Sequence, residues 1–474
     1  MIASKFVSSV ILFQLSLVSF STRKHEVCEA VSSTPSLTLN LVPKHEALRR
    51  LTEGRRLQAQ PTDALYQGYG THYVDLWVGF PIPQRQTVMV DTGSSVTAFP
   101  CAGCKNCGER FHTDSLYEYR ASETFYASTC DSCGLGACES GSDLCHVSIN
   151  YLEGSSWNAF VGHDRVYMGG NHKGHPTLPH QDTDDFEFVF GCQTSISGQF
   201  VNQLENGILG LSKKKEGSFW FQMFAQGKIL ERSFSLCYDH QPIASKSGTN
   251  AGVMSMGGYN EELHKSPLVF VKDYGTDLYT VYVEAVYLRA NGGERARPAE
   301  MPVQHTVHKL DISESQLNEY PVIVDSGTTY TFLTKEIMTT FEETWKEITG
   351  TDYNVGVPLD ITHGQLLSLP TVLFQMRADP DSVNSDNVNF NANLAGDIDP
   401  LSPTSIIVAL PASRYMEYTN GKYTPRLYLN KSGLSILGAN TMQGHDVFFD
   451  LEHDRIGWAE SNCVTGDFHP ELLN

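Results

Sequence analysis

TVMVDTGSS, the sequence of residues 87–95, is the stretch that decides the fold. It has the pattern of a short apolar strand that ends in an acidic residue, a hydroxyl residue and a glycine. A second copy, PVIVDSGTT at residues 321–329, stands about half a chain length further on. One copy would be weak evidence, because Asp-Ser-Gly is a common turn tripeptide. Two copies, each behind an apolar strand, predict two lobes that meet at Asp91 and Asp325.

The chemistry of paired carboxylates explains why these residue types recur. Two carboxylates held close together cannot both ionise easily, so they share a proton, and one acts as base while the other acts as acid. A water between Asp91 and Asp325 can then be deprotonated as it attacks a peptide carbonyl. Gly93 and Gly327 let the backbone turn tightly beside the acids. The reaction needs neither a metal nor an organic cofactor, and we expect none.

The hydroxyl residues of the two turns have predicted supporting roles. Thr92 and Ser326 can tie the turns together by bonds from hydroxyl groups to the backbone. Ser94 and Thr328 can hold the outer carboxylate oxygens. Both roles orient the two acids before a substrate arrives.

A second repeat follows each acid at a similar interval, NGILGL at residues 206–211 and SILGAN at residues 435–440. On these motifs the chain resembles the pepsin-like aspartic peptidases, over roughly residues 65–463. The resemblance implies a mostly β, bilobal fold with the active-site cleft between two pseudo-symmetric lobes. It also implies an aspartic endopeptidase with polypeptide substrates. Many short Val, Ile, Tyr and Phe runs broken by Gly and Pro agree with a β-rich chain, and the best helix candidate is residues 335–348.

Composition excludes some classes of partner. The chain has 474 residues, of which 41% are hydrophobic, and a formal net charge of −20. This balance argues against nucleic acid or an anionic membrane surface as partner, because both need a basic face. We expect a monomer.

The first residues predict a secretory signal peptide, residues 1–22. Lys5 is followed by an apolar run that is shorter than a membrane span, which disfavours a signal anchor. No later segment has the length of a membrane anchor. We therefore expect the secretory pathway, either outside the cell or in an endomembrane lumen.

Residues 23–64 are polar and carry several basic side chains. By resemblance they form a propeptide that the acidic body holds by charge; a disordered tail is the alternative. The N-terminal lobe is then expected at residues 65–233 and the C-terminal lobe at residues 234–474.

Cysteine spacing predicts disulfides. Of 11 cysteines, all except Cys28 lie from Cys101 onward, and an even number behind a signal peptide favours bridges. The alternative is a zinc site made from two Cys-x2-Cys pairs, at Cys101 and at Cys130. The oxidising secretory route favours the disulfides.

The cysteine-rich segment, residues 101–145, resembles the insert of the nepenthesin-type peptidases, which plasmepsin V-like proteases share. The resemblance implies the pairs Cys101–Cys104, Cys107–Cys192, Cys130–Cys145, Cys133–Cys138 and Cys237–Cys463.

Residues 147–156, VSINYLEGSS, alternate and end in a Gly-Ser turn, which predicts a β-hairpin tip. Pepsin-like enzymes close such a hairpin over the substrate with a Tyr, and Tyr151 fits that position. An ordinary surface hairpin is the alternative. The Trp that pepsin carries a few residues after its first turn is missing, with Ala98 and Phe99 in that place.

Glu153 carries the predicted specificity. Plasmepsin V-like proteases have Glu at this position of the flap and use it to receive a substrate arginine, with cleavage after Arg-x-Leu. A carboxylate can bind a guanidinium through two parallel hydrogen bonds. The chain contains Arg-Arg-Leu at Leu51 and at Leu57, which predicts self-processing there. A dibasic site for a proprotein convertase explains the same residues equally well.

The remaining candidate residues and functions have weaker support in the sequence. Asn430 begins the sole N-glycosylation sequon. His305 and His308 lack an evident third metal ligand, so we expect loop histidines. A broad-specificity acid protease is a second candidate function. A catalytically inert inhibitor or binding protein of the same fold is a third, and the intact turns disfavour it.

Overall fold

The computed structural model describes residues 62–67, 70–139, 141–151, 153–168, 185–239, 250–290, 306–382, 405–431 and 433–463. The expected signal peptide, nearly all of the propeptide, the two Arg-Arg-Leu sites and His305 lie outside these residues, as does the side chain of Asn430. Residues 59–474 form one compact unit. Among the described residues, no helix is both long enough and apolar enough to cross a bilayer.

Strands dominate this unit, and the largest sheet has 15 of them. In spatial order they are β13 (Val269–Lys272), β26 (Arg455–Glu460), β25 (His445–Asp450), β11 (Ser233–Tyr238), β12 (Asn250–Met256), β1 (Thr62–Gln67), β2 (His72–Val78), β3 (Gln84–Asp91), β10 (Gly207–Gly210), β4 (Ala98–Pro100), β9 (Phe186–Ser197), β8 (Ser156–Met168), β7 (Cys145–Asn150) and β6 (Ala137–Cys138), with β5 (Tyr126–Ala127) paired to β8.

The second half of the chain adds smaller sheets. A five-stranded sheet has the order β14 (Thr280–Val281), β17 (Val322–Val324), β24 (Ser435–Leu437), β18 (Phe332–Thr334) and β23 (Tyr428–Lys431). A four-stranded sheet has the order β16 (Val307–Lys309), β15 (Val283–Arg289), β19 (Thr371–Arg377) and β20 (Ser405–Leu410), and β21 (Met416–Thr419) pairs with β22 (Lys422–Pro425). The helices are α2 (Phe219–Ala225), α3 (Glu314–Leu317), α4 (Met338–Thr349), α5 (His363–Ser368), α7 (Ala412–Tyr415) and α8 (Ala439–Met442).

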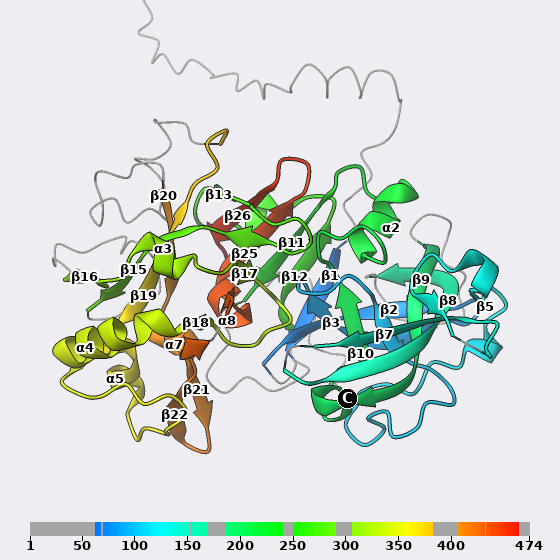
Figure 1. Ribbon diagram of the computed structural model, residues 1–474, viewed down its shortest axis with the longest axis horizontal. Coiled ribbons are helices and arrows are strands. Elements are labelled where there is room, and N and C mark those ends of the chain that lie inside the picture. The colour runs from blue at the N-terminus through cyan, green and yellow to red at the C-terminus, as the bar shows by residue number, and fades with distance from the viewer. Residues whose placement is uncertain are drawn as a thin grey trace, which may run out of the picture. The chain divides into compact units, whose positions relative to one another are not determined.

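One three-strand unit occurs twice. In the first half, β10 runs parallel to β3, with Leu209 beside Val90, and antiparallel to β4. In the second half, β24 runs parallel to β17, with Leu437 beside Val324, and antiparallel to β18. Figure 1 shows both units near the middle of the view, β3 and β10 on the right and β17 and β18 on the left. The predicted mostly β, bilobal pepsin-like fold is confirmed.

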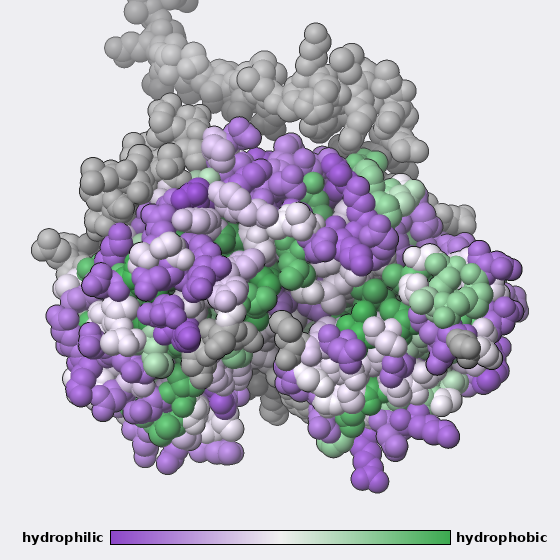
Figure 2. Space-filling view, in the orientation of Figure 1, coloured by the Kyte–Doolittle hydropathy of each residue, from purple (hydrophilic) through white to green (hydrophobic). Residues whose placement is uncertain are grey.

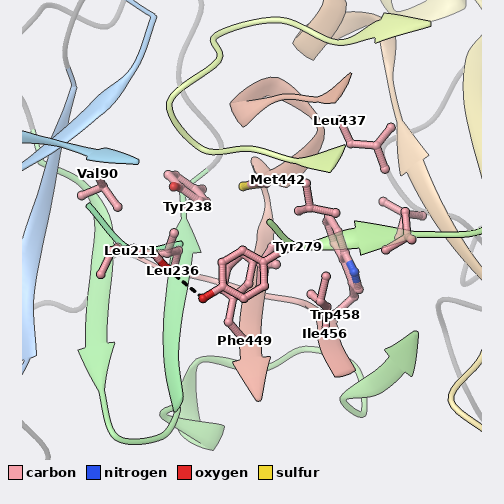
Figure 3. Close-up of a cluster of buried hydrophobic side chains, with 14 of the residues drawn as sticks. Val90, Leu211, Leu236, Tyr238, Tyr279, Leu437, Met442, Phe449, Ile456 and Trp458 are labelled. Atoms are coloured by element: carbon pink, nitrogen blue, oxygen red, sulfur yellow. Dashed lines mark hydrogen bonds between the residues drawn. The ribbon is translucent and has the colours of Figure 1, made fainter. Parts of the chain in front are cut away.

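The two units rest on one apolar core (Figure 3). Val90 and Leu437 enter it from the strands beneath the turns, and Phe449 and Trp458 enter it from β25 and β26. Full burial of one such large apolar side chain stabilises the fold by about 1.5–3 kcal/mol. Tyr279 lies within this core, and its hydroxyl donates to the carbonyl oxygen of Leu211 at 2.8 Å. Hydrophilic residues cover most of the face seen in Figure 2, which agrees with the net charge of −20.

The cysteine pairing expected from resemblance is wrong within the insert. The structure has the pairs Cys101–Cys192, Cys104–Cys107, Cys130–Cys138 and Cys133–Cys145 in place of Cys101–Cys104, Cys107–Cys192, Cys130–Cys145 and Cys133–Cys138. The pair Cys237–Cys463 is present, as expected.

Strand register explains the first difference. β4 lies parallel to β9 with Phe99 beside Cys192, and the N–H of Cys101 donates to the carbonyl oxygen of Gln193 at 3.2 Å. Cys101 therefore reaches Cys192, and Cys104 is left with Cys107 in the same turn.

Burial explains the second difference. Cys133 and Cys145 pack in one apolar cluster, whereas Cys138 is exposed and meets Cys130. Every cysteine in the described part of the chain is in a disulfide, so the alternative of a zinc site is not supported there.

Candidate active site

Asp91 and Asp325 stand at equivalent places in the two three-strand units. Asp91 is the last residue of β3, and its carbonyl oxygen accepts the N–H of Leu211 at 2.9 Å. Asp325 directly follows β17, and its N–H donates to the carbonyl oxygen of Leu437 at 3.0 Å. Each acid is therefore carried by a strand pair, which holds its backbone in place.

Reciprocal hydrogen bonds join the two turns. The N–H of Thr92 donates to Ser326 Oγ at 3.0 Å, and the N–H of Ser326 donates to Thr92 Oγ1 at 2.9 Å. Each hydroxyl then donates onward into the opposite turn, Thr92 to the carbonyl oxygen of Val324 at 3.0 Å and Ser326 to that of Val90 at 2.8 Å. We call these four bonds the hydroxyl interlock. Because each hydroxyl both donates and accepts, the interlock fixes the spacing between the turns.

A second set of bonds orients the carboxylates. Asp91 Oδ1 accepts the N–H of Gly93 at 2.8 Å, and its Oδ2 accepts the hydroxyl of Ser94 at 2.5 Å. The bonds of the second turn are Gly327 N–H to Asp325 Oδ1 at 2.9 Å and Thr328 Oγ1 to Asp325 Oδ2 at 2.5 Å. The two carboxyl groups are thus held in the same way.

Each carboxylate also packs against the glycine of the other turn. A Cβ added to Gly93 would lie 2.8 Å from Asp325 Oδ1. A Cβ added to Gly327 would collide with Asp91 Oδ1. Any side chain at either position would push the acids apart, so glycine is required by close approach and not only by turn geometry.

Burial makes this pair hold a proton. Burial raises the pKa of Asp91 well above its usual range, and the neighbouring Asp325 raises it further. The bonds from Ser94 and Gly93 act in the opposite direction and are outweighed. The pair therefore retains a proton at a pH where an ordinary carboxyl group is ionised.

Tyr151 lies in the connection between β7 and β8, close to the first turn. Its ring lies 5.2 Å from that of Phe200. Burial raises the pKa of Tyr151, as does the charge of Asp91, and the hydrogen bond from the Trp157 indole acts against them. Glu153 is exposed at the tip of the same hairpin, and its charge also raises the pKa of Tyr151. The hairpin thus brings Tyr151 within electrostatic reach of Asp91, and Glu153 within electrostatic reach of Tyr151.

Trp157 is a site residue that the motifs do not reveal. Its indole N–H donates to the Tyr151 hydroxyl at 3.1 Å, and its side chain is buried in a cluster that includes Ala98. The indole from β8 therefore packs near the position at which pepsin carries its own Trp. The sequence feature that could have revealed Trp157 is its spacing from Tyr151. The two residues stand on either side of the hairpin tip, and Trp157 in β8 pairs with Ile149 in β7.

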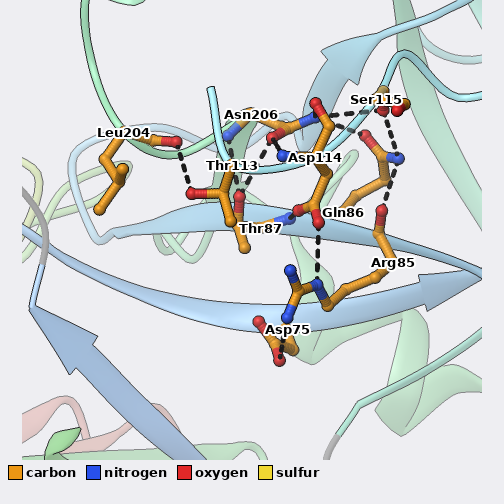
Figure 4. A network of polar contacts seen from close by, with 9 residues as sticks. All are labelled: Asp75, Arg85, Gln86, Thr87, Thr113, Asp114, Ser115, Leu204 and Asn206. Atoms are coloured by element: carbon orange, nitrogen blue, oxygen red, sulfur yellow. Dashed lines mark hydrogen bonds and ion pairs between the residues drawn. The ribbon is translucent and has the colours of Figure 1, made fainter. Parts of the chain in front are cut away.

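A polar network supports the first turn from behind (Figure 4). Asn206, directly before β10, donates to Gln86 Oε1 at 3.2 Å and accepts the hydroxyl of Thr87 at 3.2 Å. It also accepts the N–H of Asp114 at 2.9 Å, and Asp114 Oδ1 accepts Arg85 Nε at 2.8 Å. One amide side chain thereby links β3, β10 and the cysteine-rich insert.

Asp75 is the last residue of this network and contacts Arg85. Its carboxylate lies 3.7 Å from the Arg85 guanidinium, which also binds Asp114. Burial raises the pKa of Asp75 to about 6, although Arg85 lowers it. Asp75 is therefore a buried acid that titrates near neutral pH.

His308 lies in β16 rather than in a loop. Within the described ranges, no group of three or more His, Cys, Asp or Glu side chains could hold a metal ion.

Comparison with known proteins agrees with this geometry. A family model described as "Xylanase inhibitor N-terminal" matches residues 72–258. Aspartic protease 5 of Toxoplasma gondii is 25% identical over 83% of this chain, and plasmepsin V of Plasmodium falciparum is 24% identical over 83%. Aspartyl protease family protein 1 of Arabidopsis thaliana is 24% identical over 90%. The matched region spans 36% of the Toxoplasma protein, 72% of plasmepsin V and 76% of the Arabidopsis protein. The chain is thus similar to proteins named as aspartic proteases over most of its length, and the paired Asp turns and the duplicated three-strand unit agree with that similarity.

Proposed function

We propose that the protein is an aspartic-type endopeptidase with Asp91 and Asp325 as its catalytic pair. The observation that carries the proposal is the hydroxyl interlock, together with the packing of each carboxylate against the glycine of the other turn. An inert protein of this fold has no need to hold two buried acids against each other, because their mutual repulsion costs stability.

The geometry supports a water-activation mechanism. A water bound between the two carboxyl groups loses a proton to one of them as it attacks the peptide carbonyl. The other carboxyl group donates a hydrogen bond to the carbonyl oxygen and then a proton to the leaving nitrogen. Tyr151 closes over the bound peptide and excludes bulk water. The chemistry uses only side chains of this chain, so the proposal includes no cofactor.

We further propose a processing protease that prefers arginine on the non-primed side of the cut, in substrates of the Arg-x-Leu type. Glu153 supports this, because it is an exposed carboxylate on the same hairpin tip as Tyr151. Two of the relatives are named plasmepsin V and aspartic protease 5. An arginine side chain can reach an exposed carboxylate without the desolvation cost that a buried one imposes.

The proposal includes a cellular setting that follows from the sequence expectations. The protein is made as a monomeric zymogen in the secretory pathway, with residues 1–22 as signal peptide and residues 23–64 as propeptide. The lobes divide near residue 233. The mature enzyme acts outside the cell or in an endomembrane lumen.

Cleavage of a mixed peptide library tests the function directly. Mature protein, Asp91→Asn and Asp325→Asn are compared at several pH values. We expect cuts after Arg-x-Leu that both variants lose by at least 1000-fold, because each variant removes one half of the acid–base pair. Cleavage that survives in both variants would end the proposal. No cleavage by folded wild type at any pH would favour the inert binding protein instead.

Glu153→Ala tests the specificity separately. We expect kcat/KM for an arginine peptide to fall about 10- to 100-fold, whereas a matched peptide with norleucine in place of arginine is unaffected. Equal losses on both peptides contradict a role in arginine recognition. Cuts scattered among large apolar residues would indicate a broad-specificity acid protease that keeps the catalytic pair.

A further inference from the structure

Two aromatic side chains lie in the core behind the catalytic pair. His72 is the first residue of β2, and Tyr238 is the last residue of β11. Their ring centroids are 4.4 Å apart in an edge-on arrangement. His72 is 1% exposed and Tyr238 is 0% exposed. Tyr238 and Met442 belong to the buried cluster drawn in Figure 3.

Their polar atoms lack partners. Neither ring nitrogen of His72 has a hydrogen-bond partner in the described part of the chain, and the Tyr238 hydroxyl has none either. A neutral imidazole tolerates this at a modest cost, but a buried imidazolium without an acceptor is far more expensive. Burial accordingly lowers the pKa of His72 to about 3. The fold therefore accepts His72 only in its neutral form.

Tyr238 connects His72 to the hydroxyl interlock. Burial raises the pKa of Tyr238, whereas the adjacent hydroxyl of Ser326 lowers it. The charges of Asp325 and Asp91 raise the pKa of Tyr238 further, so this phenol lies within electrostatic reach of both acids. The Ser326 hydroxyl is one of the two hydroxyl groups that join the turns. A displacement of the phenol would consequently disturb the interlock.

The surrounding ionisable groups do not favour a charged His72. The titratable group that faces its ring is Tyr238 on β11. Behind Tyr238 stand Asp91 at the end of β3 and Asp325 after β17, which act on the phenol. Burial alone shifts the pKa of His72 and no charged side chain acts on it, so protonation of the imidazole gains no ion pair.

We propose that His72 is a positioning residue of the catalytic pair and sets the acid limit of activity. In its neutral form it supports Tyr238 beneath the Ser326 hydroxyl. In acid, a proton enters the imidazole, the charged ring leaves the core, Tyr238 shifts, and the interlock loosens before the protein unfolds. This inference rests on the proposed function and adds a lower pH limit, below which activity is lost reversibly.

His72→Phe tests the role, because phenylalanine fills a similar volume and cannot be protonated. The kcat and KM of wild type and variant are measured from about pH 1.5 to pH 8 on one peptide substrate. We expect the acid limb of the kcat profile to move down by one pH unit or more in the variant, with KM changed less than twofold. An acid limb at the same pH in both proteins overturns the proposal.

His445→Phe is the matched control. His445 is also buried, at 2% exposed, and burial also lowers its pKa to about 3, but its ring packs on Trp458 rather than behind the catalytic pair. We expect its acid limb for kcat to match that of wild type. If the acid limb of the kcat profile moves equally in His72→Phe and His445→Phe, it reflects global unfolding in acid. That result also overturns the proposal.

Histidine NMR on wild type keeps the test independent of how His72→Phe folds. The ring nitrogens of His72 must report a neutral imidazole at pH 7, and its protonation must coincide with the loss of activity and with a shift of the Ser326 amide. A neutral His72 at a pH where activity is already lost refutes the role. Absence of cleavage by folded wild type at every pH ends the proposed function, while the Ser326 shift still decides whether His72 positions the turn.

Discussion

The hydroxyl of Tyr151, the proposed flap residue, accepts a hydrogen bond from a buried indole. Trp157 N–H reaches the Tyr151 hydroxyl from β8, while Phe200 packs against the same ring. With its hydroxyl fixed in this way, Tyr151 has few orientations open to it above Asp91. The bond contributes about 1 kcal/mol if it behaves like a typical buried hydrogen bond.

Trp157→Phe should therefore lower kcat/KM about 5- to 10-fold, because Tyr151 is then less well oriented over the substrate. Steady-state kinetics on a good peptide substrate measure the effect. Trp345→Phe makes the same chemical change at a buried Trp on α4. Similar kinetic losses in the two variants would show that the effect is general destabilisation and not flap orientation.

The two acids could be predicted from sequence because their chemistry is local. Asp91 and Asp325 each stand within a few residues of their glycine and hydroxyl neighbours, so the motif contains most of the geometry. Trp157 could not be predicted in this way. Its partner Tyr151 lies across a hairpin tip, and whether the indole turns toward it is decided by the packing of β7, β8 and β9.

The strands β10 and β24 give the structure its repeat. Each is parallel to the strand that ends in an acid and antiparallel to the strand that follows the turn. Asn206 at the start of β10 supplies side-chain bonds where the short strand has few backbone bonds of its own. The Asn206 amide therefore supports the position of β10 in addition to the backbone pairing of β10 with β3 and β4.

Asn206→Ala should destabilise the fold by about 2–4 kcal/mol, because several buried groups lose their partner at once. Urea unfolding at neutral pH measures the change. Asn260→Ala is the control, since Asn260 caps the short 3-10 turn Glu261–Leu263 by a single exposed bond and should cost about 1 kcal/mol or less. Equal losses at the two positions would contradict a special role for Asn206.

Sequence periodicity found the longest helix but not its ends. The predicted helix at residues 335–348 is α4, Met338–Thr349, preceded by a 3-10 turn at Lys335–Ile337. Phe341 and Trp345 are buried, as their spacing indicates, whereas Met338 at the start of α4 is 39% exposed. The disulfides of the insert were missed for a related reason, because register between strands decides which cysteines meet.

Buried ionisable groups give the whole molecule opposing responses to pH. His72 and His445 are neutral in the folded state because burial lowers the pKa of each to about 3. In the unfolded chain each has a pKa near 6.5, so the stability they allow is lost as the pH falls below 6.5 toward 3. Asp75 acts in the opposite sense. Its folded pKa of about 6 exceeds its unfolded value near 3.8, so it costs stability as the pH rises through that range.

His445→Phe should make stability less sensitive to acid. Between pH 6.5 and about 3, wild type should lose about 1.4 kcal/mol per pH unit relative to the variant, the value for uptake of one proton on unfolding. Urea unfolding of both proteins at pH 7, 6 and 5 measures the difference. His363→Gln, a change at an exposed histidine, should leave the slope as in wild type. Parallel stability curves for wild type and His445→Phe would rule out a neutral buried His445.

The hydroxyl interlock has a consequence for the timing of biosynthesis. Thr92 leaves the ribosome long before Ser326, and until Ser326 follows it, the first turn has no partner for its amide or its hydroxyl. An interrupted chain therefore carries one acid but no catalytic pair. If the proposed function holds, hydrolytic activity cannot arise before about two thirds of the chain has been made.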